Sequence, residues 1–203
     1  MSAIPKTEWK KVGDLYKSGK PMRIVAEQYG VSIDAVVYVL RKISIPRRSF
    51  AEANHLMYEA RPASFTFQPR QDKKLEMVGA MLYWAEGYKA DTAFGLDFAN
   101  SDPDMALIFL NFLRSRYILD QRRLHFSLYH YSDQNQAELV NFWSKKLDVL
   151  PSQFKNHYVK KDPQTTRKKM SYGVLHIRYN DKKMLRDMLS LIQSYKKQYA
   201  SVG

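Results

Sequence analysis

The chain has 203 residues, of which 45% are hydrophobic and 13% aromatic, a composition that supports a packed core and excludes wholesale disorder. Its formal net charge of +13 predicts an acidic partner, nucleic acid before an anionic membrane surface. Zero cysteines exclude disulfides, thiolate zinc sites and cysteine nucleophiles. With no apolar run near the roughly 20 residues of a membrane span and no signal-peptide pattern, we expect a cytoplasmic, nucleoid-associated protein without a membrane partner.

Three helices are expected in an N-terminal unit spanning residues 1–46. The first runs over residues 9–17 and the second over residues 22–29. Gly30 supplies the left-handed residue that commonly ends a helix. Ser32 is a good N-cap for the third helix, whose inward positions are Val36, Val39 and Leu40.

The second and third of these helices have the spacing of a helix-turn-helix, in which the later helix enters the DNA major groove. The candidate DNA-binding residues on its outward side are Ser32, Ile33, Asp34, Val37, Tyr38 and Arg41. The same spacing also fits two amphipathic helices in an ordinary helical domain. Residues 1–50 contain ten Lys or Arg against four Asp or Glu, and this surplus favours DNA because phosphate contact requires it.

A short basic run follows the third helix. Arg47 and Arg48 are candidates for an arm on the DNA backbone or in a minor groove, and the alternative for them is a solvated linker. Residues 47–72 show no sustained periodicity of apolar residues, so we expect a linker there, with a short helix over residues 50–59.

A second domain is expected over residues 73–203. Its helices and strands alternate in the order α-β-α-β-α-β-β-α, with ranges 75–87, 92–99, 101–117, 124–131, 136–147, 153–160, 174–179 and 182–195. The predicted fold class is therefore α+β: a three-helix unit, then a domain whose antiparallel or mixed sheet is covered by helices on one face.

The helix over residues 75–87 is almost wholly apolar until Glu86, and Gly87 stops it. Gly79 and Ala80 precede large residues by one turn, which allows close approach to another helix. A carboxylate at the end of a buried helix is costly unless a cation or a hydrogen-bond donor meets it. The alternatives are that Glu86 is a solvated helix-end residue or pairs with Lys89.

The nine residues 79–87, with the strand after them, resemble the motif of the LAGLIDADG homing-endonuclease family and its non-cleaving regulatory relatives. Position for position, Glu86 falls on the family's metal-binding acid and Gly87 on its final glycine, while Met81 and Trp84 depart from the motif. The resemblance covers about residues 73–195. It implies a saddle-shaped sheet over DNA and Glu86 as a catalytic, Mg²⁺-binding acid if the protein is a nuclease. With a single motif copy, it also implies a homodimer that pairs through Gly79, Ala80 and Tyr83.

In such a sheet alternate side chains face the DNA, and the polar strand faces supply Asp97, His125, Ser127, Tyr129, Lys155, His157, His176 and Arg178. Each also fits an ordinary solvent-facing strand residue. Residues 151–203 hold twelve basic residues against three acidic ones. The run with Lys160, Lys161, Arg167, Lys168 and Lys169 fits phosphate contact, or a solvated charged hairpin. These five residues, with His176 and Arg178, are further DNA-binding candidates.

Together these patterns predict a homodimeric, sequence-specific double-stranded DNA-binding protein, a regulator built on a homing-endonuclease-like scaffold. The alternative is a Mg²⁺-dependent site-specific DNA endonuclease of the LAGLIDADG type. No cofactor is certain. The motif over residues 21–41 disfavours an RNA-binding or membrane-surface protein.

Overall fold

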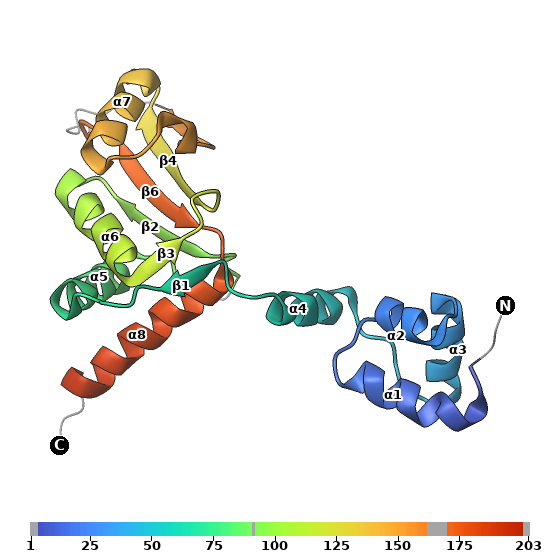
Figure 1. The fold of residues 1–203 in the computed structure, drawn as a ribbon. Helices are drawn as coiled ribbons and strands as arrows, with labels where there is room; N and C mark the ends of the chain where they lie inside the picture. The colour runs from blue at the N-terminus through green and yellow to red at the C-terminus, as the bar shows by residue number, and fades with distance from the viewer. Residues whose placement is uncertain (1–3, 91, 162–169, 201–203) are drawn as a thin grey trace. The chain divides into compact units, whose positions relative to one another are not determined.

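The computed structural model describes residues 4–90, 92–161 and 170–200. The chain divides into two compact units, Met1–Pro62 and Ala63–Gly203, which we call units 1 and 2 (Figure 1). The boundary between the two units falls inside the expected linker, residues 47–72. Helix α4 (Phe50–Ala60) belongs to unit 1, where Leu56 lies against Gly19, and the residues after Pro62 belong to unit 2.

Unit 1 begins with a short 3-10 helix, η1 (Lys6–Glu8). It is followed by α1 (Trp9–Lys17) and α2 (Met22–Tyr29), at the bounds that the sequence predicted, and by α3 (Ile33–Lys42), which begins after the predicted N-cap Ser32. Gly30 has a φ of 61°, the left-handed conformation expected at the end of α2.

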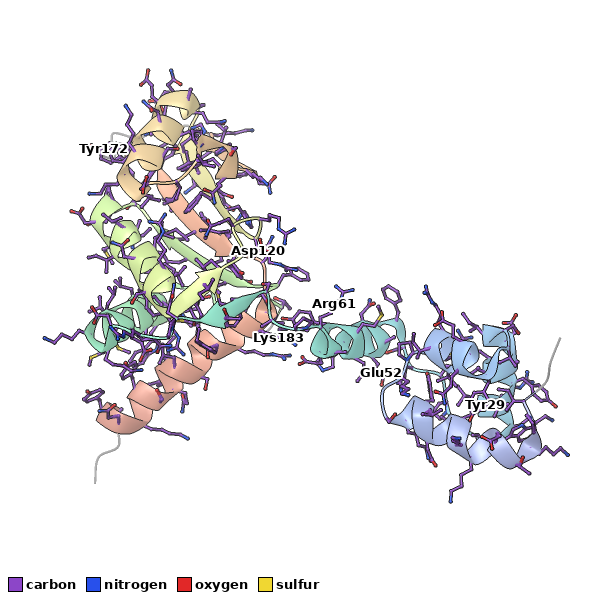
Figure 2. The ribbon with its side chains drawn as sticks, in the orientation of Figure 1. Tyr29, Glu52, Arg61, Asp120, Tyr172 and Lys183 are labelled. Carbon is purple, nitrogen blue, oxygen red and sulfur yellow. The ribbon has the colours of Figure 1, made fainter. Side chains whose placement is uncertain are left out.

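The core of unit 1 forms from one stripe of each helix. The buried residues at these positions include Val12, Tyr16, Val25, Ala26, Val36, Val39 and Leu40. At the N-terminus of α3, the Ser32 hydroxyl accepts a hydrogen bond from the Ala35 backbone amide at 3.3 Å. The Tyr29 hydroxyl donates to Glu8 Oε2 at 3.0 Å, which joins α2 to η1 (Figure 2).

Unit 2 is an α+β unit, as the sequence predicted at this level. Its helices are α5 (Lys73–Glu86), α6 (Pro103–Arg116), α7 (Gln136–Leu147) and α8 (Lys182–Ala200), with a 3-10 turn η2 (Pro151–Gln153). Its strands are β1 (Phe65–Phe67), β2 (Leu96–Asn100), β3 (Tyr117–Leu119), β4 (Leu124–Tyr131), β5 (Tyr158–Lys160) and β6 (Val174–Tyr179).

The strands form two sheets. β1 and β3 pair antiparallel, and the larger sheet has the order β2-β6-β4-β5, in which only β4 and β5 run parallel. The charged hairpin considered for residues 153–179 is therefore wrong. β5 pairs with β4, because β6 enters between β2 and β4 instead of turning back beside β5.

The helices of unit 2 begin at side chains that accept hydrogen bonds from the first turn. Asp72, Asp102 and Asn135 cap α5, α6 and α7, and Pro103 occupies the first turn of α6.

Helices α6 and α7 cover one face of the larger sheet (Figure 1). Phe98 of β2 stacks on Phe109 of α6 with ring centroids 4.1 Å apart. The other strands contribute Leu175, Ile177, Phe126 and Leu128 to the same core, and all four are fully buried. The opposite face, which we call the open face, carries the polar alternate residues.

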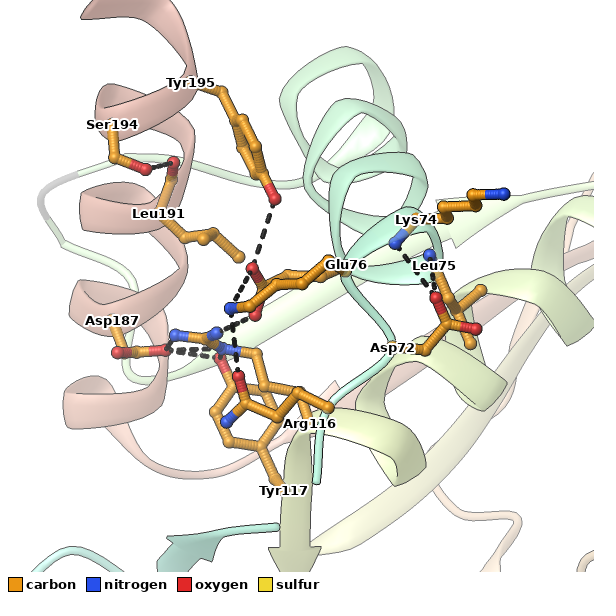
Figure 3. A network of polar contacts seen from close by, with 12 residues as sticks. Asp72, Lys74, Leu75, Glu76, Arg116, Tyr117, Asp187, Leu191, Ser194 and Tyr195 are labelled. Carbon is orange, nitrogen blue, oxygen red and sulfur yellow. Dashed lines mark hydrogen bonds and ion pairs between the residues drawn. The ribbon is translucent and has the colours of Figure 1, made fainter. Parts of the chain in front are cut away.

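A buried polar network fixes α5 and α8 to the end of α6 (Figure 3). The Arg116 guanidinium, with a side chain 12% exposed, donates to Glu76 Oε2 and to Asp187 Oδ2, the latter at 2.9 Å from Nη2. The Tyr117 hydroxyl donates to Asp187 at 2.6 Å, and the Tyr195 hydroxyl donates to Glu76 at 3.2 Å. The sequence reasoning missed this network because its members lie up to 119 residues apart.

Candidate nucleic-acid interface

The outward side of α3 carries most of the predicted DNA-binding side chains in exposed positions. Val37 is the exception, since it is half-buried beside Arg41 and Ser44. The others are exposed, namely Ser32, Ile33, Asp34, Tyr38 and Arg41. The residues between these positions point into the core of unit 1. The helical period of about 3.6 residues therefore places the predicted side chains on the opposite, solvent-facing side of α3.

Tyr38 is held in place although its side chain is 55% exposed. Its ring meets the Trp9 ring edge-on with centroids 6.2 Å apart, and Lys42 Nζ lies 5.5 Å from its centroid. Trp9 and Lys42 were not among the predicted DNA-binding residues, although Lys42 belongs to the basic surround of the motif. The i,i+4 spacing of Tyr38 and Lys42 was a usable signal, whereas nothing local points to Trp9.

The two predicted arm residues differ. Arg47 is exposed, but Arg48 is held within unit 1. Its guanidinium lies 3.9 Å from the centroid of the Tyr16 ring and donates to the Lys20 carbonyl at 3.1 Å, while its backbone amide donates to the Tyr16 hydroxyl at 2.7 Å. Arg48 therefore does not extend as a free arm: its guanidinium stacks on the Tyr16 ring and its backbone amide bonds to the Tyr16 hydroxyl.

Six of the eight predicted polar strand residues share the open face through the strand register. They are Asp97, His125, Ser127, Tyr129, His176 and Arg178. Lys155 lies outside the named strands near His125, whose pKa it helps to lower. His157 is tied to the sheet edge, since its Nδ1 accepts from the Leu128 backbone amide at 3.3 Å.

Arg178 lies at the centre of the open face. Its Nε donates to Asp97 Oδ2 at 2.8 Å, its Nη1 to the Ser127 hydroxyl at 3.2 Å, and its Nη2 to the Tyr129 hydroxyl at 3.2 Å. His176 Nδ1 lies 2.9 Å from the other Asp97 oxygen. The structure thus brings the predicted residues His176 and Arg178 together on one carboxylate.

Charge on this face is internally compensated. Burial alone raises the pKa of Asp97, but the hydrogen bonds and charges of His176 and Arg178 outweigh it and hold that pKa below its usual value. Burial, with the charges of Arg178 and Lys155, lowers the pKa of His125. Asp97 is therefore ionised and His125 neutral at neutral pH.

Aromatic side chains gather toward the β5 edge of the open face. The Tyr129 ring lies 4.2 Å from the His176 ring and 5.3 Å from the Tyr158 ring, measured between centroids. Lys160 is half-buried on β5 and Lys161 is exposed just after it. The other predicted phosphate contacts, Arg167, Lys168 and Lys169, lie outside the described residues.

Glu86 is exposed at the end of α5. Lys89 does not pair with it: its Nζ donates to the backbone carbonyls of Trp84 and Gly87, which end the helix, at 3.0 and 2.5 Å. In the described ranges no group of three His, Asp or Glu residues is placed to hold a metal ion. One copy of the chain therefore does not fit the Mg²⁺ that the family resemblance implies, because Mg²⁺ needs several oxygen ligands and the nearest cation-binding carbonyls already hold an ammonium group.

The predicted dimer face of α5 is used inside unit 2. A Cβ added to Gly79 would lie 2.0 Å from Phe112 of α6, and both Ala80 and Tyr83 are fully buried. The prediction that these three residues pair with a second copy is wrong, because α6 occupies the space that the small residues leave.

Scans against protein-family models, curated proteins and solved structures found no match. No helix in the described part of the chain has the length and apolarity needed to cross a membrane.

Proposed function

We propose that this protein binds double-stranded DNA sequence-specifically as a homodimer, and that unit 1 is a helix-turn-helix module whose recognition helix is α3. The observation that carries the proposal is the exposed side of α3, where Tyr38 and Arg41 project from a helix whose other side is sealed in the core. A rigid helix with projecting polar side chains is what major-groove readout requires.

The proposal is tested by selecting binding sites from a random duplex library and measuring the affinity of the selected site by mobility shift. Replacing both Tyr38 and Arg41 by Ala should weaken binding to that site by about tenfold or more, because a good base contact contributes roughly 1–3 kcal/mol. Lys145→Ala, an exposed lysine on α7, is the control for lost charge. Equal affinities for the double variant and the control would refute α3 as the recognition helix.

We propose a scaffold like that of the LAGLIDADG family for unit 2, acting as a regulator and not as a nuclease. Support comes from the motif-like helix ending at Glu86, followed by a mixed sheet with helices on one face. Glu86 is exposed and belongs to no group of three His, Asp or Glu residues in the described ranges, which argues against cleavage. Incubating supercoiled and selected-site DNA with Mg²⁺ is the test, and cleavage abolished by Glu86→Gln would establish the endonuclease alternative.

A homodimer requires a surface other than the one first predicted. We propose the outward face of α5, whose exposed or half-buried apolar residues are Met77, Val78, Met81 and Leu82. Exposed Lys74 and Glu86 stand at opposite ends of this face. If two copies of α5 pair antiparallel about a twofold axis midway between these residues, Lys74 of each copy lies opposite Glu86 of the other. Sedimentation should show a dimer that Met81→Glu converts to monomer; a monomer at all concentrations, free and on DNA, would refute the homodimer.

A further inference from the structure

The hydrogen-bonding groups of the open face satisfy one another. Arg178 donates from Nε and both terminal nitrogens to Asp97, Ser127 and Tyr129. Bidentate readout of a guanine edge needs a guanidinium with two free donors projecting into the groove. The terminal nitrogens of Arg178 already donate to the Ser127 and Tyr129 hydroxyls, and its Nε is held on Asp97, so turning the guanidinium toward a base edge would give up these bonds. The open face is therefore poorly suited to reading a duplex by base edges.

Aromatic rings and lysines are what this face presents instead. Tyr158 is 56% exposed on β5 and packs beside Tyr129, whose hydroxyl is fixed by Arg178. The register places Tyr131 opposite Lys160 on the same side of the sheet. Fixed tyrosines beside lysines on a sheet surface are the combination that binds unpaired bases, because each base offers a π-face and each nucleotide a phosphate.

A second aromatic pair lines a pocket of about 410 Å³ at the other edge of the face, beside β2. Phe94 is 91% exposed and Tyr88 is 54% exposed. Asp97, Arg178 and Asn180 contribute polar groups to the same pocket. Apolar walls with a few convergent polar groups are typical of a small-ligand pocket, and this volume lies within the usual range of roughly 300–1,000 Å³.

We propose that the open face binds a single-stranded segment of nucleic acid. Unpaired bases stack on Tyr158 and Tyr129, and a further base enters the pocket between Phe94 and Tyr88. Lys155, Lys160 and Lys161 contact the phosphates. In a duplex the base faces are covered by their neighbours, so these rings find partners only where the strands are apart. This site lies wholly within unit 2 and does not depend on α3.

The test uses the full chain and two labelled probes of equal phosphate number, a short oligothymidylate and an oligomer of the same length without bases. Anisotropy should show the oligothymidylate binding at least about tenfold more tightly, since each stacked base contributes that much or more. An oligouridylate arm distinguishes DNA from RNA as the source of the strand. Equal affinity for the probes with and without bases would overturn the proposal, because phosphate attraction alone would then account for binding.

Two exposed aromatic substitutions locate the site without disturbing the core. Tyr158→Ala and Phe94→Ala should each lower oligothymidylate affinity about tenfold and leave the base-free probe unchanged. Tyr199→Ala, which removes a tyrosine 64% exposed on α8, is the matched control. If the Tyr158 and Phe94 variants bind as tightly as the Tyr199 control, the open face is not the site.

The proposal and the helix-turn-helix assignment can fail separately. The double Ala variant at Tyr38 and Arg41 should bind the selected duplex about tenfold or more weakly and bind the oligothymidylate as the natural chain does. An oligonucleotide carrying 5-iododeoxyuridine should cross-link to Tyr158 or Phe94 on irradiation, as read by peptide mass spectrometry. Cross-links confined to unit 1 would overturn the single-strand site and leave the duplex proposal standing.

Discussion

The Arg116 guanidinium joins three helices of unit 2 through two carboxylates. Glu76 is the more buried of these acids, with a side chain 5% exposed, and its other cation, Lys73, is 73% exposed. Removing Glu76 leaves the buried Arg116 with Asp187 alone, and breaking a buried pair costs up to about 3–5 kcal/mol, whereas an exposed pair contributes about 0–1 kcal/mol. We expect Glu76→Ala to lower the free energy of unfolding by several kcal/mol and Lys73→Ala to leave it nearly unchanged in urea titrations. Similar losses in both variants would contradict this account of the network.

The Glu76 carboxyl should also make the free energy of unfolding depend on pH in the acid range. Burial raises the pKa of Glu76, but the Lys73 hydrogen bond and the charges of Arg116 and Lys73 outweigh it, so the folded pKa lies below the unfolded value. Its stabilisation is therefore present above the unfolded pKa of about 4.3 and lost as pH falls through the lower folded pKa. In urea titrations below about pH 5, Glu76→Gln should lose less stability with falling pH than the natural chain does. Parallel pH profiles would contradict the assignment.

At the same scale, sequence reasoning located charged residues but not the residues that hold them. Arg48 and Arg178 were both predicted to contact DNA. The structure places the first over Tyr16 and the second on Asp97. Tyr16 lies 32 residues before Arg48, and Asp97 lies 81 before Arg178, so no local pattern announces either contact. The outward positions of α3 were predictable because the helical period alone determines them.

At the scale of elements, the close approach of α5 to α6 depends on Gly79. Gly79→Ala gains up to about 1 kcal/mol of helix propensity, but its Cβ meets the Phe112 ring, and forced overpacking costs about 1–3 kcal/mol. We expect a net loss of stability in chemical unfolding. The double variant Gly79→Ala with Phe112→Leu should recover part of the lost stability, because the smaller leucine side chain leaves room for the added Cβ. Purely additive losses would show that the two residues do not meet.

Local sequence signals predicted most of the helices and strands. The elements that depend on strand pairing were missed. The bounds of α1, α2 and α7 follow from apolar periodicity with a cap or a stop at each end. β1 and β3 were missed because each has three residues, too few for a period, and their pairing partners lie about fifty residues apart. The sheet order was unreadable for the same reason: a strand's neighbours are chosen by non-local packing.

At the scale of the whole molecule, the two units have separate hydrophobic cores. Calorimetry should therefore resolve two transitions. Val36→Ala, which opens a cavity in unit 1, should lower one melting temperature by several degrees, and Gly79→Ala should lower only the other. A single transition that moves with both substitutions would show that the units unfold together.

The position of β6 in the larger sheet has a consequence for synthesis. β6 lies between β2 and β4, yet it is made after the other strands of this sheet. Asp181, just after β6, accepts hydrogen bonds from the Ser64 amide and hydroxyl, 117 residues earlier. The sheet therefore stays incomplete on the ribosome until residues 174–179 have emerged. Unit 1, whose contacts are local, can complete its fold long before that. A nascent chain thus carries a finished α3 while the strands of unit 2 are still unpaired. In this interval unit 2 depends most on protection from aggregation.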